Sequence, residues 1–109
     1  NDFGYSDVFS YQLESNAREG DLLIAISSSG ASPNIAKALH TARAMGVLSL
    51  ALVGFAGGEA AELADEALWV RAENYGLVED DHQSLMHIFA QFLRQSKIKD
   101  VELLGHRKF

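Results

Sequence analysis

Four serines gather within six residues, in the segment AISSSGASPN at residues 25–34. The serines follow the apolar run LLIAI at residues 22–26. Ser32 and Pro33 form a typical helix start, because serine caps a helix N-terminus and proline fits its first turn. The amides at that helix start would face the hydroxyls, and together they suit an anion such as phosphate. The hydroxyls of this predicted phosphate loop belong to Ser27, Ser28, Ser29 and Ser32.

The phosphate loop lacks the features of the common nucleotide-binding loops. No lysine follows Gly30, and no G-x-G-x-x-G pattern is present. We therefore favour a small phosphorylated metabolite over a nucleoside triphosphate, with Gly30 letting the backbone come close. The spacing alone leaves a second interpretation open, in which Ser32 caps the helix and the other serines only fill the loop.

The segment at residues 78–95 is predicted to be a long helix with histidines on two sides. At 100° per residue, His82 falls near the apolar stripe, which is typical of a hydrogen-bonded core histidine. His87 falls on the opposite side, so it faces solvent, a partner subunit or a site. From the pattern alone a solvated face is the simpler interpretation. The predicted apolar stripe consists of Val78, Leu85, Phe89, Phe92 and Leu93.

The remaining elements alternate along the chain and predict the fold class. Continuous apolar runs indicate strands buried on both faces, and they alternate with segments of helical spacing. This order predicts a three-layer α/β/α architecture with a parallel sheet, in which ligands bind beyond the carboxyl ends of the strands. Trp69 is expected in the core. The predicted helices cover 5–17, 33–45, part of 55–65 and 78–95, and the strands cover 22–26, 47–54 and 66–70.

Three strands make a narrow sheet for this architecture. We therefore expect residues 1–109 to form one partial domain, the later part of a larger one.

The composition excludes several classes of function. The chain has 109 residues, a net charge of −6 and no cysteine. An acidic chain with scattered lysines and arginines is not expected to bind nucleic acid, and disulfides and thiolate metal sites are excluded. No apolar stretch approaches the ~20 residues of a membrane span, and no signal peptide opens the chain. We expect a soluble cytoplasmic protein.

Four segments carry a resemblance to a known family. AISSSGASPNIAKAL resembles the sugar-phosphate loop of SIS (sugar isomerase) domains. NDFGYSDVF, VGFAGGEAAELAD and LVEDDHQSLMHIFAQFL resemble the phosphoheptose isomerase branch of that family. The resemblance implies a flavodoxin-like or Rossmann-like α/β/α fold and a homo-oligomer, often a tetramer. It also implies interconversion of sedoheptulose 7-phosphate and D-glycero-D-manno-heptose 7-phosphate, which supplies heptose for lipopolysaccharide.

The resemblance also implies roles for single residues. The serines matching Ser27, Ser28, Ser29 and Ser32 hold the substrate phosphate. The residues matching Asn1 and Asp2 contact the sugar. Glu79 and His87 match two ligands of a zinc ion, and His87 also matches a residue that transfers protons. The family usually has glutamine at the position of Glu79. The glutamate of this chain keeps an oxygen ligand and adds a negative charge.

The spacing of Glu79 and His87 limits how they could share a metal ion. Eight helical residues separate their Cα atoms by about 12 Å, with directions roughly 80° apart. A shared tetrahedral zinc would be strained. Either Glu79 precedes the regular helix, or the two residues belong to different sites built across a subunit interface. We favour the interface.

The resemblance places the other half of the family site on an earlier helix. That helix supplies a histidine and the glutamate that acts as general base, which aldose–ketose isomerisation requires. Neither is found in these 109 residues, so we expect this chain alone to be inactive.

Two other functions remain open from the sequence. The first is a non-catalytic SIS module that binds a sugar phosphate or a protein partner in a regulatory role. His87 favours the enzyme, since a purely regulatory protein has no need of it. The second is an isomerase or synthase acting on amino-sugar phosphates, and the NDFGY opening at residues 1–5 argues against it.

Overall fold

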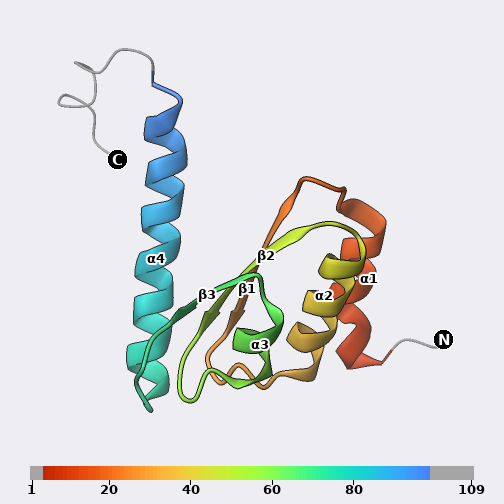
Figure 1. Ribbon diagram of the computed structural model, residues 1–109. Coiled ribbons are helices and arrows are strands. Elements are labelled where there is room, and N and C mark those ends of the chain that lie inside the picture. Colours follow the sequence, from red (N-terminus) through yellow and green to blue (C-terminus); the bar gives the residue numbers. More distant parts are fainter. Residues whose placement is uncertain (1–3, 99–109) are drawn as a thin grey trace.

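The computed structural model describes residues 4–98, which form an alternating series of helices and strands. Figure 1 follows this order along the chain. This order confirms the predicted alternation of helices and strands. The helix α4 starts earlier than expected, because the Asn74 side chain caps it by accepting a hydrogen bond from the amide of Leu77 at 3.0 Å. The elements are η1 (Tyr5–Asp7), α1 (Val8–Asn16), β1 (Leu22–Ser27), α2 (Pro33–Ala44), β2 (Leu48–Val53), α3 (Gly58–Leu63), β3 (Glu66–Trp69) and α4 (Tyr75–Ser96).

The three strands form one parallel sheet in the order β1-β2-β3. Leu22 of β1 pairs with Leu48 of β2, and Leu50 of β2 pairs with Glu66 of β3. Because successive side chains of a strand point to opposite faces of the sheet, every second side chain faces α2 and α3, and the others face the opposite side. The buried core on the side of α2 and α3 contains Ala25, Leu39, Ala51, Val53, Ala60 and Ala64.

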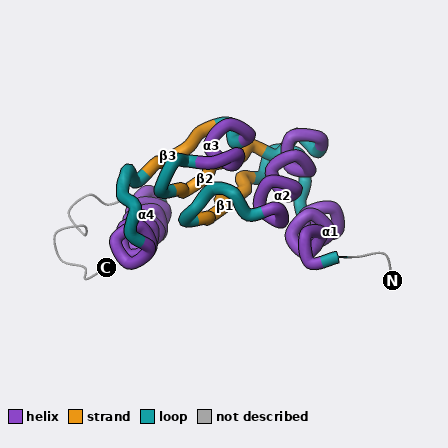
Figure 2. The backbone as a smooth tube through the Cα atoms, turned by 90° about the horizontal axis from the view of Figure 1, so that it is seen from below, coloured by secondary structure: helices purple, strands orange, loops and turns teal. Residues whose placement is uncertain are grey.

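Helices cover both faces of the sheet, as predicted. The helices α2 and α3 pack on one face of the sheet. The helix α4 lies on the opposite face, where it contacts β2. α1 packs on α2 instead of on the sheet (Figure 2). An ion pair of Asp7 with Lys37 joins the start of α1 to α2. The hydrogen bond from Lys37, followed by the Gly4 amide, holds the pKa of Asp7 below its ordinary value of 3.8.

The far half of α4 lies outside the core, which corrects the predicted apolar stripe. Val78 is fully buried, but Phe92 is 69% exposed and Leu93 is 60% exposed. A strand of six residues spans about 20 Å and a helix of 22 residues about 33 Å, so α4 continues past the sheet (Figure 1).

The expectation that Trp69 is a core residue is wrong, because its side chain is 41% exposed. Its indole N–H donates to the carbonyl of Phe55 at 2.9 Å. The guanidinium of Arg71 lies 4.3 Å from the ring centroid. The last strand ends the sheet on this side among the described residues, so one face of the indole meets a cation instead of core side chains.

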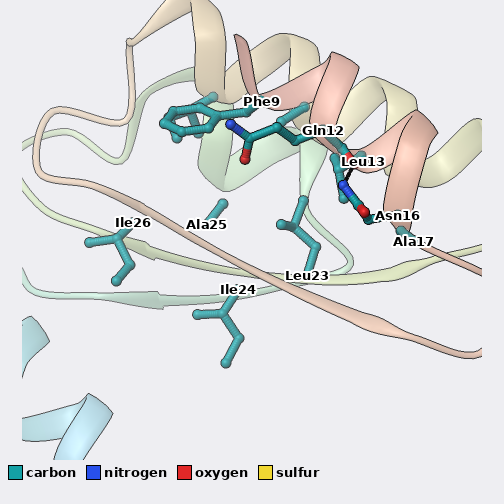
Figure 3. A pocket seen from close by; sticks show the side chains of 11 residues that line it. Phe9, Gln12, Leu13, Asn16, Ala17, Leu23, Ile24, Ala25 and Ile26 are labelled. Carbon is teal, nitrogen blue, oxygen red and sulfur yellow. Dashed lines mark hydrogen bonds between the residues drawn. The ribbon is translucent and has the colours of Figure 1, made fainter.

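A pocket of about 490 Å³ lies between α1 and β1 (Figure 3). It contains no serine, histidine or charged side chain, so it offers little to a phosphate. Its walls are formed by Phe9, Gln12, Leu13, Asn16, Ala17, Leu23, Ile24, Ala25, Ile26, Ile35 and Ala38. Separately, no helix within residues 4–98 is long and apolar enough to cross a membrane.

Candidate functional site

The serine loop lies at the carboxyl end of β1, where the sequence places it. Ser27 is the last residue of β1, and Ser32 occupies the N-cap position of α2, followed by Pro33. The turn after β2 and the first turn of α4 lie at the same end of the sheet (Figure 1). Three segments distant in sequence therefore meet where parallel α/β sheets bind their ligands.

The hydroxyls of the loop have different hydrogen-bonding partners. Ser27 is 6% exposed, and its Oγ accepts from the amide of Gly30 at 3.0 Å. Ser27 Oγ also lies 3.2 Å from Ser32 Oγ. Ser29 Oγ accepts from the Ala31 amide at 3.1 Å. None of these bonds involves the Ser28 hydroxyl. Ser27 and Ser32 thus hold the loop together, while Ser28 keeps its hydroxyl available.

The start of α2 differs from the expectation in one detail. Ser32 occupies the N-cap, but its side chain makes no capping hydrogen bond, because its Oγ is turned toward Ser27. The Oδ1 of Asn34 instead accepts from the following amide, that of Ile35, at 2.9 Å. The serine side chain therefore braces the loop and does not cap the helix.

Gly30 makes a close approach, but to another loop of the protein. Its φ is +70°, and a Cβ built on it would lie 1.9 Å from the carbonyl oxygen of Gly57. Its own carbonyl accepts from the Ala60 amide at 2.9 Å. A Cβ on Gly58 would likewise lie 2.5 Å from Gly30. The serine loop is thus packed, backbone against backbone, on the glycine turn that follows β2.

Gly54 brings α4 against the same loop. A Cβ at this position would lie 2.5 Å from Cγ1 of Val78 and 2.9 Å from the carbonyl oxygen of Ser28. The sequence has three glycines at positions 54, 57 and 58, at and just after the end of β2. Their number immediately after a buried strand was the signal for close backbone packing.

A pocket of about 190 Å³ opens between the end of β1 and the first turns of α4. It brings together Ser28 and Glu79 from among the predicted site residues. Ser29, Ser32 and His87 do not line it. Sequence reasoning did not place Gln83 here. Its position four residues after Glu79, on the same side of one helix, was the available signal. The pocket is lined by Ile26, Ser28, Glu79, His82, Gln83 and Met86.

The two histidines of α4 lie in different surroundings, as their helical positions predict. His82 is 3% exposed, and its Nε2 lies 3.0 Å from the carbonyl oxygen of Val53. His87 is exposed, and its Nε2 lies 3.3 Å from the amide nitrogen of Gln83. Since the Gln83 amide donates, it uses the lone pair of His87 that would accept a proton or a metal ion.

Glu79 lies inside the regular helix, since α4 begins at Tyr75. This excludes the alternative in which Glu79 precedes the helix. Within residues 4–98, no group of three His, Cys, Asp or Glu side chains is placed to hold a metal ion. Asn1 and Asp2, the predicted sugar contacts, lie outside the described residues.

Comparison with known protein families matches residues 2–89 to the SIS domain. The chain belongs to the SIS-domain family. Among curated proteins, the chain is 40% identical over 100 residues to a phosphoheptose isomerase of Sulfurimonas denitrificans. That match covers 92% of this chain and 51% of the relative. This SIS chain therefore spans about half the length of the curated relatives it matches.

Solved structures give the same result for the fold. The phosphoheptose isomerase of Neisseria gonorrhoeae matches with a TM-score of 0.77 and 34% identity, over 81% of this chain and 50% of that one. The phosphoheptose isomerase of Francisella tularensis matches with a TM-score of 0.83 and 28% identity, over 87% of this chain and 51% of that one. Both comparisons confirm the predicted α/β/α architecture.

Proposed function

We propose that the protein containing this SIS chain is a sugar-phosphate isomerase of the phosphoheptose type. Its reaction interconverts sedoheptulose 7-phosphate and D-glycero-D-manno-heptose 7-phosphate. The observation that supports this most strongly is the serine loop at the carboxyl end of β1, next to the start of α2. The similarity to proteins named phosphoheptose isomerases supports the choice of a seven-carbon sugar.

In this proposal the serines divide the work of binding phosphate. Ser28 and Ser29 lie at the turn itself and donate hydroxyls to the phosphate oxygens. Ser27 and Ser32, whose hydroxyls lie 3.2 Å apart, keep the loop in shape. Binding energy at the phosphate, remote from the reacting carbons, orients the sugar for proton transfer.

His87 serves as the acid/base group of α4. Isomerisation moves a proton between neighbouring carbons through an enediol, and a proton donor near the carbonyl oxygen lowers that barrier. Histidine titrates in the required range. Its present neighbour, the Gln83 amide, would have to turn away before the ring nitrogen could exchange a proton with substrate.

We further propose that Glu79 and His87 contribute to different zinc sites, each completed by ligands from outside residues 4–98. The donor types suit the metal, since carboxylate oxygen and imidazole nitrogen both bind zinc. The spacing along α4 and the lack of a third ligand within residues 4–98 call for an interface site. Metal analysis of the purified full-length protein and of its His87→Ala variant tests this, and equal zinc content in both would contradict it.

We also propose a homo-oligomer, with a tetramer as the favoured form, and the exposed apolar side chains of the same helix support an interface between copies. Ile88, Phe92 and Leu93 are 58%, 69% and 60% exposed on the half of α4 that passes the sheet. Exposed apolar side chains on one helix are typical of interaction surfaces. We propose that a second copy covers them. Light scattering should show a smaller assembly for Phe92→Gln but not for Leu48→Gln, a 62% exposed leucine on β2.

We place this reaction in the cytoplasm, where phosphorylated sugars are made and retained because their charge opposes membrane crossing. The aldose product would supply heptose units for lipopolysaccharide. This setting rests on the similarity to phosphoheptose isomerases.

Turnover by the full-length protein tests the proposed function. Sedoheptulose 7-phosphate is incubated with the protein, and the aldose is followed by the NMR signal of its anomeric proton. We expect conversion by the wild type, a loss of at least about 100-fold in His87→Asn, consistent with a general acid/base role, and no loss in His40→Asn. His40 is an exposed histidine of α2 and serves as the matched control.

Tight binding of sedoheptulose 7-phosphate without any conversion would overturn the enzyme proposal. It would support the alternative of a regulatory SIS module. Equal conversion by His87→Asn and wild type would remove His87 from the mechanism while leaving the isomerase assignment in place.

A further inference from the structure

The small pocket between β1 and α4 is polar on two opposite sides. Ser28 contributes a hydroxyl from the serine loop, and Glu79 and Gln83 contribute a carboxylate and an amide from α4. Its volume of about 190 Å³ corresponds to about six water molecules at ~30 Å³ each. A short chain of hydroxyl-bearing carbons fits in this space.

His82 lines the same pocket and has one ring nitrogen without a hydrogen-bond partner among residues 4–98. Its Nε2 lies 3.0 Å from the Val53 carbonyl oxygen, and a carbonyl only accepts, so Nε2 carries the hydrogen. In the neutral ring, Nδ1 is then left as an acceptor. Nδ1 is buried and has no hydrogen-bond partner within residues 4–98. Buried polar atoms in folded proteins are nearly always hydrogen-bonded, so the working protein is expected to bring a donor to Nδ1.

The surroundings of His82 indicate what kind of donor this is. A phosphate held by the serine loop would lie beside Ser28, which also lines the pocket. The rest of such a molecule would extend toward α4. Gln83 and Met86 also line the pocket, and their unbranched side chains can change rotamer at low cost to admit a donor beside the ring.

We propose that His82 is a substrate-binding residue whose Nδ1 accepts a hydrogen bond from a hydroxyl group of the phosphorylated polyol. This inference rests on the proposed function and assigns a further contact in it. Nε2 of His82 meanwhile holds α4 on β2, so the same ring fixes the helix and contacts the ligand. Inorganic phosphate lacks the hydroxyl chain and does not make the contact.

Two substitutions separate the roles of the two ring nitrogens. Glutamine at position 82 can place an amide N–H where Nε2 lies and keep the hydrogen bond to Val53, but it lacks the Nδ1 acceptor. Asparagine can place an oxygen near the Nδ1 position, but it is too short to reach Val53. Calorimetry on the intact, assembled protein compares sedoheptulose 7-phosphate with inorganic phosphate for His82→Gln, His82→Asn and wild type.

We expect His82→Gln to bind sedoheptulose 7-phosphate about three- to tenfold more weakly, which corresponds to one lost neutral hydrogen bond. Its affinity for inorganic phosphate should match the wild type within a factor of about two. His82→Asn should keep most of the sugar-phosphate affinity and unfold at a lower urea concentration. Wild-type affinity for the sugar phosphate in His82→Gln would overturn the inference and leave the proposed function intact.

Failure of the wild type to bind either compound would overturn both the proposed function and this inference. If His82→Gln does not fold, ¹⁵N NMR of labelled histidine in the wild type decides. The Nδ1 signal of His82 should shift when sedoheptulose 7-phosphate is added and stay in place with inorganic phosphate. An unmoved signal at saturation with the sugar phosphate would contradict the proposal.

Discussion

Replacing Gly30 with alanine should damage both stability and phosphate binding, because Gly30 joins the serine loop to the turn after β2. A Cβ there would lie 1.9 Å from the carbonyl oxygen of Gly57, and real Cβ atoms essentially never approach closer than 3.0 Å. The two backbones must therefore separate by about 1 Å. That movement also breaks the 2.9 Å hydrogen bond from the Ala60 amide to Gly30.

The expected loss of stability is the sum of two parts. Alanine in a left-handed conformation costs about 1–2 kcal/mol. The broken hydrogen bond adds about 0.5–1.5 kcal/mol. Gly20→Ala is the matched control, because Gly20 also has a positive φ of +95° but nothing lies within 4 Å of its Cβ. Urea unfolding should thus show a loss of about 1–2 kcal/mol for Gly20→Ala and about 1.5–3.5 kcal/mol for Gly30→Ala.

Binding separates the two variants further. A displacement of about 1 Å in the serine loop should weaken sugar-phosphate binding by about tenfold or more in Gly30→Ala. Gly20→Ala, in the turn between α1 and β1, should bind as the wild type does. Equal unfolding and equal affinity of the two variants would refute the role we give to the Gly30 contact.

Four other substitutions test the structure at separate points. Ser27→Ala should lower stability by about 1 kcal/mol through its lost hydrogen bonds, whereas Ser28→Ala should leave urea unfolding unchanged and weaken phosphate binding in calorimetry. Asp65→Ala should cost about 1–3 kcal/mol in urea unfolding, because its carboxylate accepts from the buried Ser49 amide at 2.9 Å. Because the pKa of Asp7 is lower in the folded protein than its ordinary value of 3.8, the ionised carboxylate stabilises the fold above pH 3.8. This stabilisation is lost as the pH falls through the lower pKa of the folded protein. Asp7→Asn should therefore show a slightly smaller loss of thermal stability on acidification below about pH 4, and an identical profile would contradict this.

The order of elements could be predicted from the sequence because local patterns determine it. The apolar run at residues 22–26 indicated β1, and Ser32 with Pro33 marked the start of α2. The expected burial of that strand on both faces is wrong at its ends, where Leu22 is 58% exposed and Ile26 is 44% exposed. The placement of His82 in the core and of His87 outside it followed from helical periodicity alone.

The wrong predictions of burial concern residues whose exposure depends on how far the neighbouring helices and strands extend. The periodicity of α4 gives its apolar side, but only the lengths of the strands determine where the sheet stops covering it. Phe92 and Leu93 are exposed for this reason. Tryptophan is a large aromatic residue, and for this reason burial of Trp69 was predicted. Trp69 lies on the last strand of the described sheet, where no further strand covers it, and its side chain is therefore exposed.

The details of the site were beyond sequence reasoning because they depend on contacts between distant segments. The approach of Gly30 to Gly57, and of Gly54 to Val78, brings the serine loop and α4 to one pocket. The spacing of the serines indicated a phosphate loop, yet it could not show that Ser27 and Ser32 bond each other. Asn1 and Asp2 stay as predictions.

Amide NMR of the intact, assembled protein during titration with sedoheptulose 7-phosphate tests most directly whether the serine loop holds the phosphate ester. We expect the largest saturable shifts at residues 27–34, with smaller ones at the first turns of α4. Inorganic phosphate should shift the same loop signals and leave those of α4 in place. Shifts confined to the apolar pocket between α1 and β1, or no shift at residues 27–34 at saturating ligand, would contradict the assignment of this loop.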